Sequence, residues 1–126
     1  MASDLVQPYL NDPSPSVPLE VTVRIDGTHT VLEVRGEVDL ASAPTLGACL
    51  DQAVAEPSRS VILDLAGVSF LDSTGVNTVV RANNALVMSE RQLIVRNPRP
   101  AVRQVFEITG VVGHVLVEPG RDPASP

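Results

Sequence analysis

The sequence predicts a single α/β domain whose mixed, mostly parallel sheet of four to five strands carries helices packed on it. Short apolar stretches with the alternation or continuity of strands recur along the chain. Segments with apolar residues at helical spacing separate the later stretches, and the connections between them are short. The predicted order is β-β-α-β-α-β-α-β, and 126 residues suit one domain.

The first part of the chain predicts a tail followed by a hairpin. Residues 1–18 contain four prolines among polar residues without periodicity, so we expect a flexible N-terminal tail. Residues 21–25 alternate between apolar and polar, which predicts a half-exposed strand. Asp26-Gly27 is a hairpin-turn signal, so we expect the next strand, around residues 31–34, to run antiparallel to the first.

A helix is predicted after residues 36–40, with Ser42 as its N-cap and Pro44 tolerated in its first turn. Its buried stripe consists of Leu46, Cys49, Leu50, Ala53 and Val54. Cys49 is the only cysteine, so it cannot form an intramolecular disulfide. We expect it to be a small core residue, with a redox role as the alternative.

Residues 61–80 are the stretch around which the rest is organised. The apolar run at residues 61–65 predicts a central buried strand, followed by a short loop and by a helix that begins at about Ser73. The apolar stripe of this helix consists of Val76, Val79, Val80, Leu86 and Val87. Asn83 falls within the stripe, where we expect a boundary position with solvent access or, alternatively, a polar contact with a partner.

The last part of the chain predicts a strand, a helix and a short final strand. Residues 93–95 form the strand, and Asn97-Pro98 are expected to cap and start the helix. The helical stripe consists of Val102, Val105, Phe106 and Thr109, with Gly110 as the C-terminal cap. Residues 115–117 predict the final strand, and residues 119–126 a flexible tail, so the folded domain should span residues 19–118.

Composition argues against several classes of protein. A net charge of −6 without a basic stripe, together with 2% aromatic residues, does not suit a nucleic-acid binder. All nine cationic residues are arginine, so no lysine can bind phosphate or form a Schiff base. His29, His114 and Cys49 have no zinc-site spacing, so we expect no metal. Without a signal sequence or a long apolar run, we expect a cytoplasmic protein that does not insert into membranes.

The segment Asp72-Ser73-Thr74-Gly75 concentrates polar groups between a strand and a helix, where functional groups collect in α/β sheets. The residues alone leave two interpretations open. The hydroxyls of Ser73 and Thr74 could cap the helix, or one of them could accept a phosphate, which the helix dipole favours and Asp72 opposes.

Catalysis is not expected. The carboxylates of Glu37, Asp39 and Asp72 could serve a hydrolase. However, neither histidine has an obvious route to Ser73, there is no Gly-x-Ser-x-Gly motif, and nothing indicates a substrate pocket.

Three segments resemble the signature segments of STAS domains, and more narrowly those of the bacterial anti-sigma factor antagonists. They are residues 36–40 (Gly-Glu-Val-Asp-Leu), residues 64–76, which include Asp72-Ser73-Thr74-Gly75, and residues 109–111. The resemblance covers residues 19–118. The family usually has glycine before the fourth strand, where this chain has Ser89-Glu90-Arg91.

The resemblance implies a phosphorylation-controlled switch. The unphosphorylated chain would bind an anti-sigma factor of the histidine-kinase-like ATPase type and free a sigma factor. That partner would use its own ATP to phosphorylate Ser73, so this chain needs no cofactor, and a PP2C-type phosphatase would reverse the step. Thr74 is a weaker acceptor.

The switch loop and partner surface implied by the resemblance consist of Asp72, Ser73, Thr74, Gly75, Gly36, Glu37 and Asp39. Gly75 would let the partner approach the backbone closely. The alternative is a non-enzymatic STAS interaction module in a larger signalling assembly or a transporter-associated complex.

Overall fold

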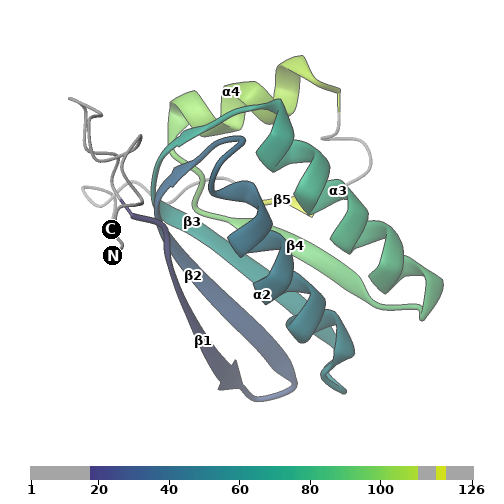
Figure 1. Cartoon of the computed structure of the whole chain (residues 1–126). Helices are drawn as coiled ribbons and strands as arrows, with labels where there is room; N and C mark the ends of the chain where they lie inside the picture. Colours follow the sequence, from purple (N-terminus) through teal and green to yellow (C-terminus); the bar gives the residue numbers. More distant parts are fainter. Residues whose placement is uncertain (1–17, 111–115, 119–126) are drawn as a thin grey trace, which may run out of the picture.

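The computed structural model describes residues 18–110 and 116–118 (Figure 1). Its elements are β1 (Glu20–Asp26), β2 (His29–Val38), α2 (Ala43–Ala55), β3 (Ser60–Leu71), α3 (Ser73–Met88), β4 (Gln92–Arg96), α4 (Pro100–Ile108) and β5 (Leu116–Val117). The predicted class and order are confirmed. Both predicted tails apart from Pro18, and also His114 and Val115, lie outside the described residues.

The described strands form one sheet in the order β1-β2-β3-β4-β5. β1 is antiparallel to β2, and the other neighbours are parallel. Asp26 pairs with His29, so the hairpin loop consists of Gly27 and Thr28. Gly27 has a φ of +63°, which glycine adopts without steric cost. The hairpin predicted at this point is therefore confirmed.

Two helices cover one face of the sheet. Figure 1 shows α2 and α3 side by side across this face, and α4 at the end where β2 and β3 finish. Among the described residues, the core between these helices and the sheet is built almost entirely from Val, Leu and Ala side chains, with Phe106 of α4 as its single aromatic residue. Cys49 is half-buried and packs against this core rather than lying inside it.

β3 is longer than the sequence predicts. The loop expected after residues 61–65 is wrong, because the strand continues to Leu71. The pairing of β3 with β2 shifts register twice, after Asp64 and after Val68, and each shift gives β3 one extra residue. Such bulges interrupt the period of two by which a strand is identified in a sequence.

The two bulges also decide which β3 side chains face the core. Leu65, Val68 and Leu71 are all buried although they are three residues apart rather than two. Phe70 pairs with Glu37 and remains 48% exposed. The bulges therefore keep the apolar residues of β3 in the core and leave an aromatic ring outside.

The ends of two helices differ from the prediction. Ser42 occupies the N-cap position of α2, but its side chain caps no helical N–H group. α4 begins at Pro100, not at Pro98, because Arg99 precedes a proline and is restricted to the extended conformation it adopts. Asn97 lies outside the helix with a φ of +56°. The cap predicted at Gly110 is confirmed, with a φ of +77° and an N–H donated to the carbonyl of Glu107.

Asn83 is 5% exposed, so the expectation of a solvent-accessible boundary position is wrong. It lies four residues after Val79 and three before Leu86, both fully buried on the same face of α3. Helical periodicity places the amide in the interior, and this outweighs the usual preference of Asn for the surface.

Candidate functional site

The candidate site forms where β2 and β3 end side by side. Val38 and Leu71 are paired residues at the carboxyl ends of these parallel strands, and Asp39 and Asp72 follow them directly. The N–H of Asp72 donates to the carbonyl of Val38 at 3.2 Å. The fold therefore brings together two segments that are more than thirty residues apart, as expected for functional groups beyond parallel strand ends.

Asp72 is the N-cap of α3. Its Oδ1 accepts hydrogen bonds from the N–H groups of Thr74 at 2.9 Å and Gly75 at 3.2 Å. The interpretation that the hydroxyls of Ser73 and Thr74 cap this helix is therefore wrong, because the carboxylate already takes these donors. Ser73 is the first helical residue and is exposed, whereas Thr74 is half-buried. No hydrogen bond joins the Ser73 hydroxyl to another described residue.

Gly75 is buried in the first turn of α3. A Cβ atom here would lie 2.8 Å from Cγ1 of Val38 and 2.9 Å from Cγ of Leu71. The missing side chain thus lets the first turn of α3 pack directly on the two strand ends. Packing inside the domain thus requires the glycine, and its role in close approach by a partner stays a prediction.

Gly36 is also buried and also serves the interior. Its φ is +114°, and a Cβ would lie 2.8 Å from the carbonyl oxygen of Pro18. Pro18 and Leu19, which lead into β1, therefore lie close against the backbone of β2 at this glycine. Gly36 and Gly75 are both buried and allow close packing next to the exposed residues of the site.

Asp39 organises a tight turn between β2 and α2. Its Oδ1 accepts from the N–H groups of Ser42 at 2.9 Å and Ala41 at 3.0 Å. The Ser42 hydroxyl accepts from the Asp39 N–H at 3.0 Å and lies 2.7 Å from the carbonyl of Glu37, to which it donates. Ser42 therefore closes this turn instead of capping the helix.

The same contacts set the ionisation of Asp39. The backbone N–H of Ser42 is the largest cause that holds the pKa of Asp39 below its ordinary value of 3.8. Partial burial acts in the opposite direction, and the Ser42 hydroxyl and the Ala41 N–H add to the lowering. Asp39 is therefore a fixed negative charge at neutral pH, held in one orientation.

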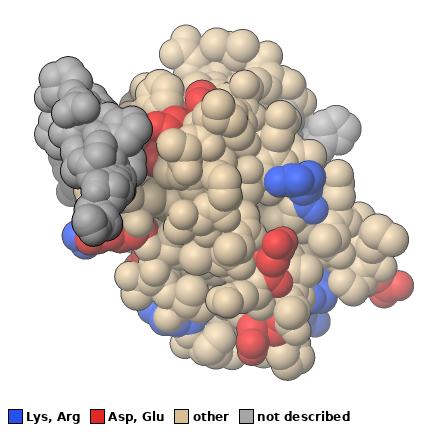
Figure 2. Space-filling view, viewed as in Figure 1, with Lys and Arg blue, Asp and Glu red and all other residues tan. Residues whose placement is uncertain are grey.

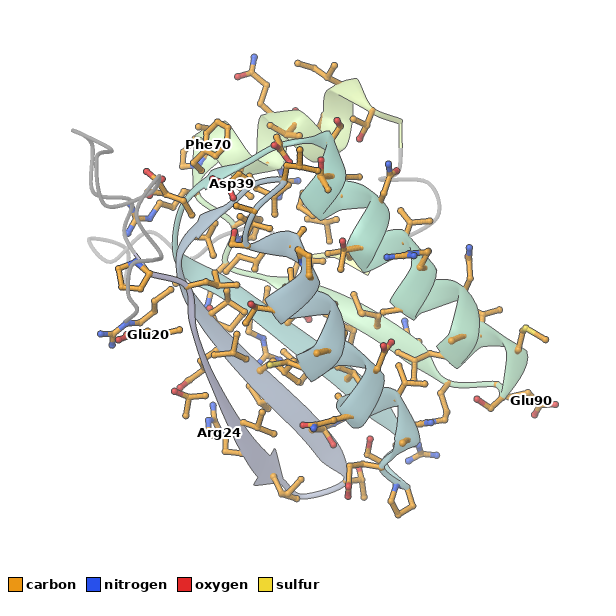
Figure 3. All side chains as sticks on the ribbon, in the orientation of Figure 1. Glu20, Arg24, Asp39, Phe70 and Glu90 are labelled. Atoms are coloured by element: carbon orange, nitrogen blue, oxygen red, sulfur yellow. The ribbon has the colours of Figure 1, made fainter. Side chains whose placement is uncertain are left out.

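Two exposed apolar side chains flank the acidic groups, and sequence reasoning did not find them. Leu40 is 76% exposed and Phe70 is 48% exposed. Figure 3 shows Phe70 and Asp39 at the same end of the domain. We call Glu37, Asp39, Leu40, Phe70, Asp72 and Ser73 the Ser73 surface. One available signal was that Phe70 is one of only two phenylalanines in a chain poor in aromatic residues.

The Ser73 surface carries three carboxylates, and none of them forms an ion pair with a described residue. Glu37 and Asp39 line one open depression of ≈ 260 Å³ with Pro18 and Leu19. Figure 2 shows few charged side chains over the adjoining face formed by α2 and α3. A surface of this kind suits contact with another protein better than enclosure of a small substrate.

No histidine among the described residues lies near Ser73. His29 starts β2 and hydrogen-bonds to Ser60, so it lies about 30 Å from the far end of the strand at 3.3 Å per residue. Across residues 18–110 and 116–118, no cluster of His, Cys, Asp and Glu is arranged to hold a metal ion. None of the described helices has the length and apolarity needed to cross a membrane.

Comparison with known families identifies the kind of domain that carries this site. Residues 20–124 match the STAS domain family, so the chain belongs to that family. The resemblance drawn from residues 36–40, 64–76 and 109–111 is confirmed at this level.

Individual relatives show which members of the STAS family this chain is similar to. The anti-sigma-B factor antagonist of Staphylococcus aureus is 29% identical over 91 residues, which cover 72% of this chain and 84% of that protein. An anti-sigma factor antagonist from Mycobacterium paratuberculosis has a similar structure, with a TM-score of 0.71 and 24% identity over 83% of this chain and 91% of that one.

The Bacillus protein SpoIIAA has the same fold in two chemical states. Its unphosphorylated form aligns with a TM-score of 0.68 and 24% identity over 79% of this chain and 89% of that one. Its phosphorylated form aligns with a TM-score of 0.61 and 22% identity over 79% and 92% of the two chains. These likenesses confirm the predicted fold.

Proposed function

We propose that this chain is an anti-sigma factor antagonist that works by partner switching. In the unphosphorylated state, the Ser73 surface binds an anti-sigma factor, which then releases its sigma factor. The observation that carries this proposal is the position of Ser73, exposed at the first residue of α3. Its hydroxyl is not engaged by the described part of the fold, and the apolar side chains of Leu40 and Phe70 lie exposed near it.

The relatives support this proposal. The Staphylococcus aureus protein is named as an anti-sigma-B factor antagonist, and SpoIIAA is an anti-sigma factor antagonist known in both phosphorylation states. A phosphate on a SpoIIAA-like fold is therefore compatible with the folded domain.

Phosphorylation of Ser73 would change the surface more than the fold. The N–H groups of Thr74 and Gly75, which could otherwise receive the phosphate, already bind the Asp72 carboxylate. A phosphate carries about −1.5 to −2 charges, so Asp72 and Asp39 would repel it toward solvent. On the solvent side, the phosphate would lie in the surface that contacts the anti-sigma factor. Its charge and bulk would then prevent the anti-sigma factor from binding.

The partner we propose is an anti-sigma factor of the histidine-kinase-like ATPase type, which supplies both the ATP and the catalytic groups. This chain accepts the phosphate without a cofactor or catalysis of its own, and a PP2C-type phosphatase removes it. Thr74 is a poorer acceptor than Ser73 because it is half-buried. We place the exchange in the cytoplasm, where sigma factors act.

The test is phosphorylation of the full chain by a candidate anti-sigma factor kinase with ATP, followed by peptide mass spectrometry. We expect phosphate on the peptide that contains Ser73 and none on a Ser73→Ala variant. A kinase that is active on another substrate but leaves this peptide unmodified would contradict the proposal. Phosphate on the same peptide of the Ser73→Ala variant would identify Thr74, and not Ser73, as the acceptor.

A further inference from the structure

Another open depression lies on the face of the sheet opposite α2 and α3. Val34 of β2 packs in the core under these helices, so the next residue, Arg35, points to the opposite face, where it is exposed. The depression has a volume of ≈ 330 Å³, which is several times the roughly 30 Å³ that one water molecule occupies. Its lining includes Glu20, Arg35, Gly36, Gly67, Ser69 and Arg99.

Arg99, the residue before α4, is held beside this depression by β3. Its Nε donates to the carbonyl of Ala66 at 2.9 Å, and Ala66 lies in the bulge that follows Asp64. No hydrogen bond or ion pair with a described residue engages the two Nη atoms of Arg99. One edge of the guanidinium group is therefore fixed, and the donors of its Nη atoms remain for a ligand.

Arg35 reaches the same depression from β2, and Gly67 makes room for its side chain. The two residues are paired across the strands. A Cβ atom on Gly67 would lie 2.5 Å from Cγ of Arg35 and 3.0 Å from the carbonyl oxygen of Val34. The missing side chain thus lets the stem of Arg35 lie across β3, beside the residue to which Arg99 is bound.

The charges around the depression favour an anion. Two guanidinium groups line it with only one carboxylate, that of Glu20, although the chain as a whole carries a net charge of −6. Glu20 lies 3.5 Å from Arg35, but the two side chains are 63% and 73% exposed, and exposed pairs of this kind contribute little. A ligand with two negative charges can therefore compete with Glu20 for Arg35.

We propose that this depression binds the phosphate group of a small molecule. Guanidinium groups match phosphate oxygens with pairs of donors. The Ser69 hydroxyl adds a further donor, because its own bond to the carbonyl of Gly36 is long, at 3.5 Å. Two guanidinium groups and a hydroxyl suit the charge and the oxygen atoms of a phosphate better than those of a carboxylate.

The proposed phosphate site is independent of the Ser73 surface. The two sites share no residue, so the phosphate site does not depend on the function proposed for Ser73. The volume of the depression also leaves room for the organic part of a small phosphate ester.

Titration of the full chain with inorganic phosphate at constant ionic strength, followed by NMR, tests the proposal. We expect saturable shifts of the amide signals of Gly36, Gly67 and Ser69, and acetate should bind at least tenfold more weakly. Glycerol phosphate, titrated alongside, distinguishes a phosphate ester, which should bind more tightly through its organic part, from free phosphate. Absence of saturable binding of both phosphate probes, or equally tight binding of acetate, would overturn the proposal.

Substitutions with opposite expected effects test which groups bind. Arg35→Gln and Arg99→Gln should each raise the dissociation constant of phosphate about tenfold, because each removes charged donors. Glu20→Gln should lower this constant, because it removes the competing carboxylate, and a gain in affinity cannot result from misfolding. Arg81→Gln on α3 removes the same charge from another exposed position and should have no effect. Equal losses of affinity in all three arginine variants, or wild-type affinity in Arg35→Gln and Arg99→Gln, would overturn the proposal.

Discussion

Gly75 in the first turn of α3 packs against Val38 at the end of β2 so closely that a Cβ would lie 2.8 Å from the Val38 Cγ1 atom. Gly75→Ala should therefore overpack this contact and lower the free energy of unfolding by about 1–3 kcal/mol, as measured in urea. Gly47→Ala is the control, because its Cβ would meet Thr78 at an ordinary 3.5 Å. That helix-interior change should stabilise the domain by about 0.5–1 kcal/mol. A neutral Gly75→Ala variant would contradict the proposed packing.

The capping role of Asp72 predicts a separate loss of stability. Asp72→Ala removes the acceptor for the N–H groups of Thr74 and Gly75 and should cost about 0.5–2 kcal/mol in urea unfolding. Asp72→Asn keeps a capping oxygen and should retain most of that stability. If Asp72→Ala unfolds at the same urea concentration as wild type, another residue must cap α3.

Glu90 predicts a gain in stability on substitution. It has a φ of +59°, in the left-handed region that a side chain disfavours, just before β4. Glu90→Gly should stabilise the domain by up to about 1 kcal/mol, because the relief of about 1–2 kcal/mol exceeds the entropic cost of glycine. Glu90→Ala keeps a Cβ and should bring no such gain. Equal stabilities of the two variants in thermal unfolding would argue against backbone strain at this position.

Asp39 predicts a pH dependence of stability with a definite sign. Since folding lowers its pKa below 3.8, its ionised form contributes stability above that pH, and the contribution disappears as pH falls through the lower, folded-state pKa. Thermal unfolding of wild type and Asp39→Asn should therefore differ at pH 6 and converge as the pH falls below 3.8. A difference in melting temperature that stays constant over this range would contradict the account.

The sequence was sufficient to predict features that depend on local periodicity. Apolar spacing predicted the helical stripes that contain Leu46, Val79 and Phe106, and the turn at Asp26-Gly27 predicted the hairpin. Features that depend on how two segments meet were not predictable in this way. The bulges of β3 are defined only by its pairing with β2, and they determine that Phe70 is exposed.

The candidate site was likewise predictable from the sequence only in part. A motif resemblance was enough to select Ser73, but not to assign the capping role to Asp72 rather than to the hydroxyls. The packing of Gly75 on Val38 and the exposure of Leu40 likewise depend on tertiary contacts. Burial of Asn83 follows from its place on α3, although its residue type argues for the surface.

The central claim is that the charge at Ser73 controls binding of an anti-sigma factor, and calorimetric titration of the cognate anti-sigma factor tests it most directly. Wild type and Ser73→Ala should bind, whereas Ser73-phosphorylated protein and Ser73→Asp should bind at least tenfold more weakly. Asn84→Asp adds the same single charge at another exposed position of α3 and should bind like wild type. Undiminished affinity of the phosphorylated protein would contradict the account.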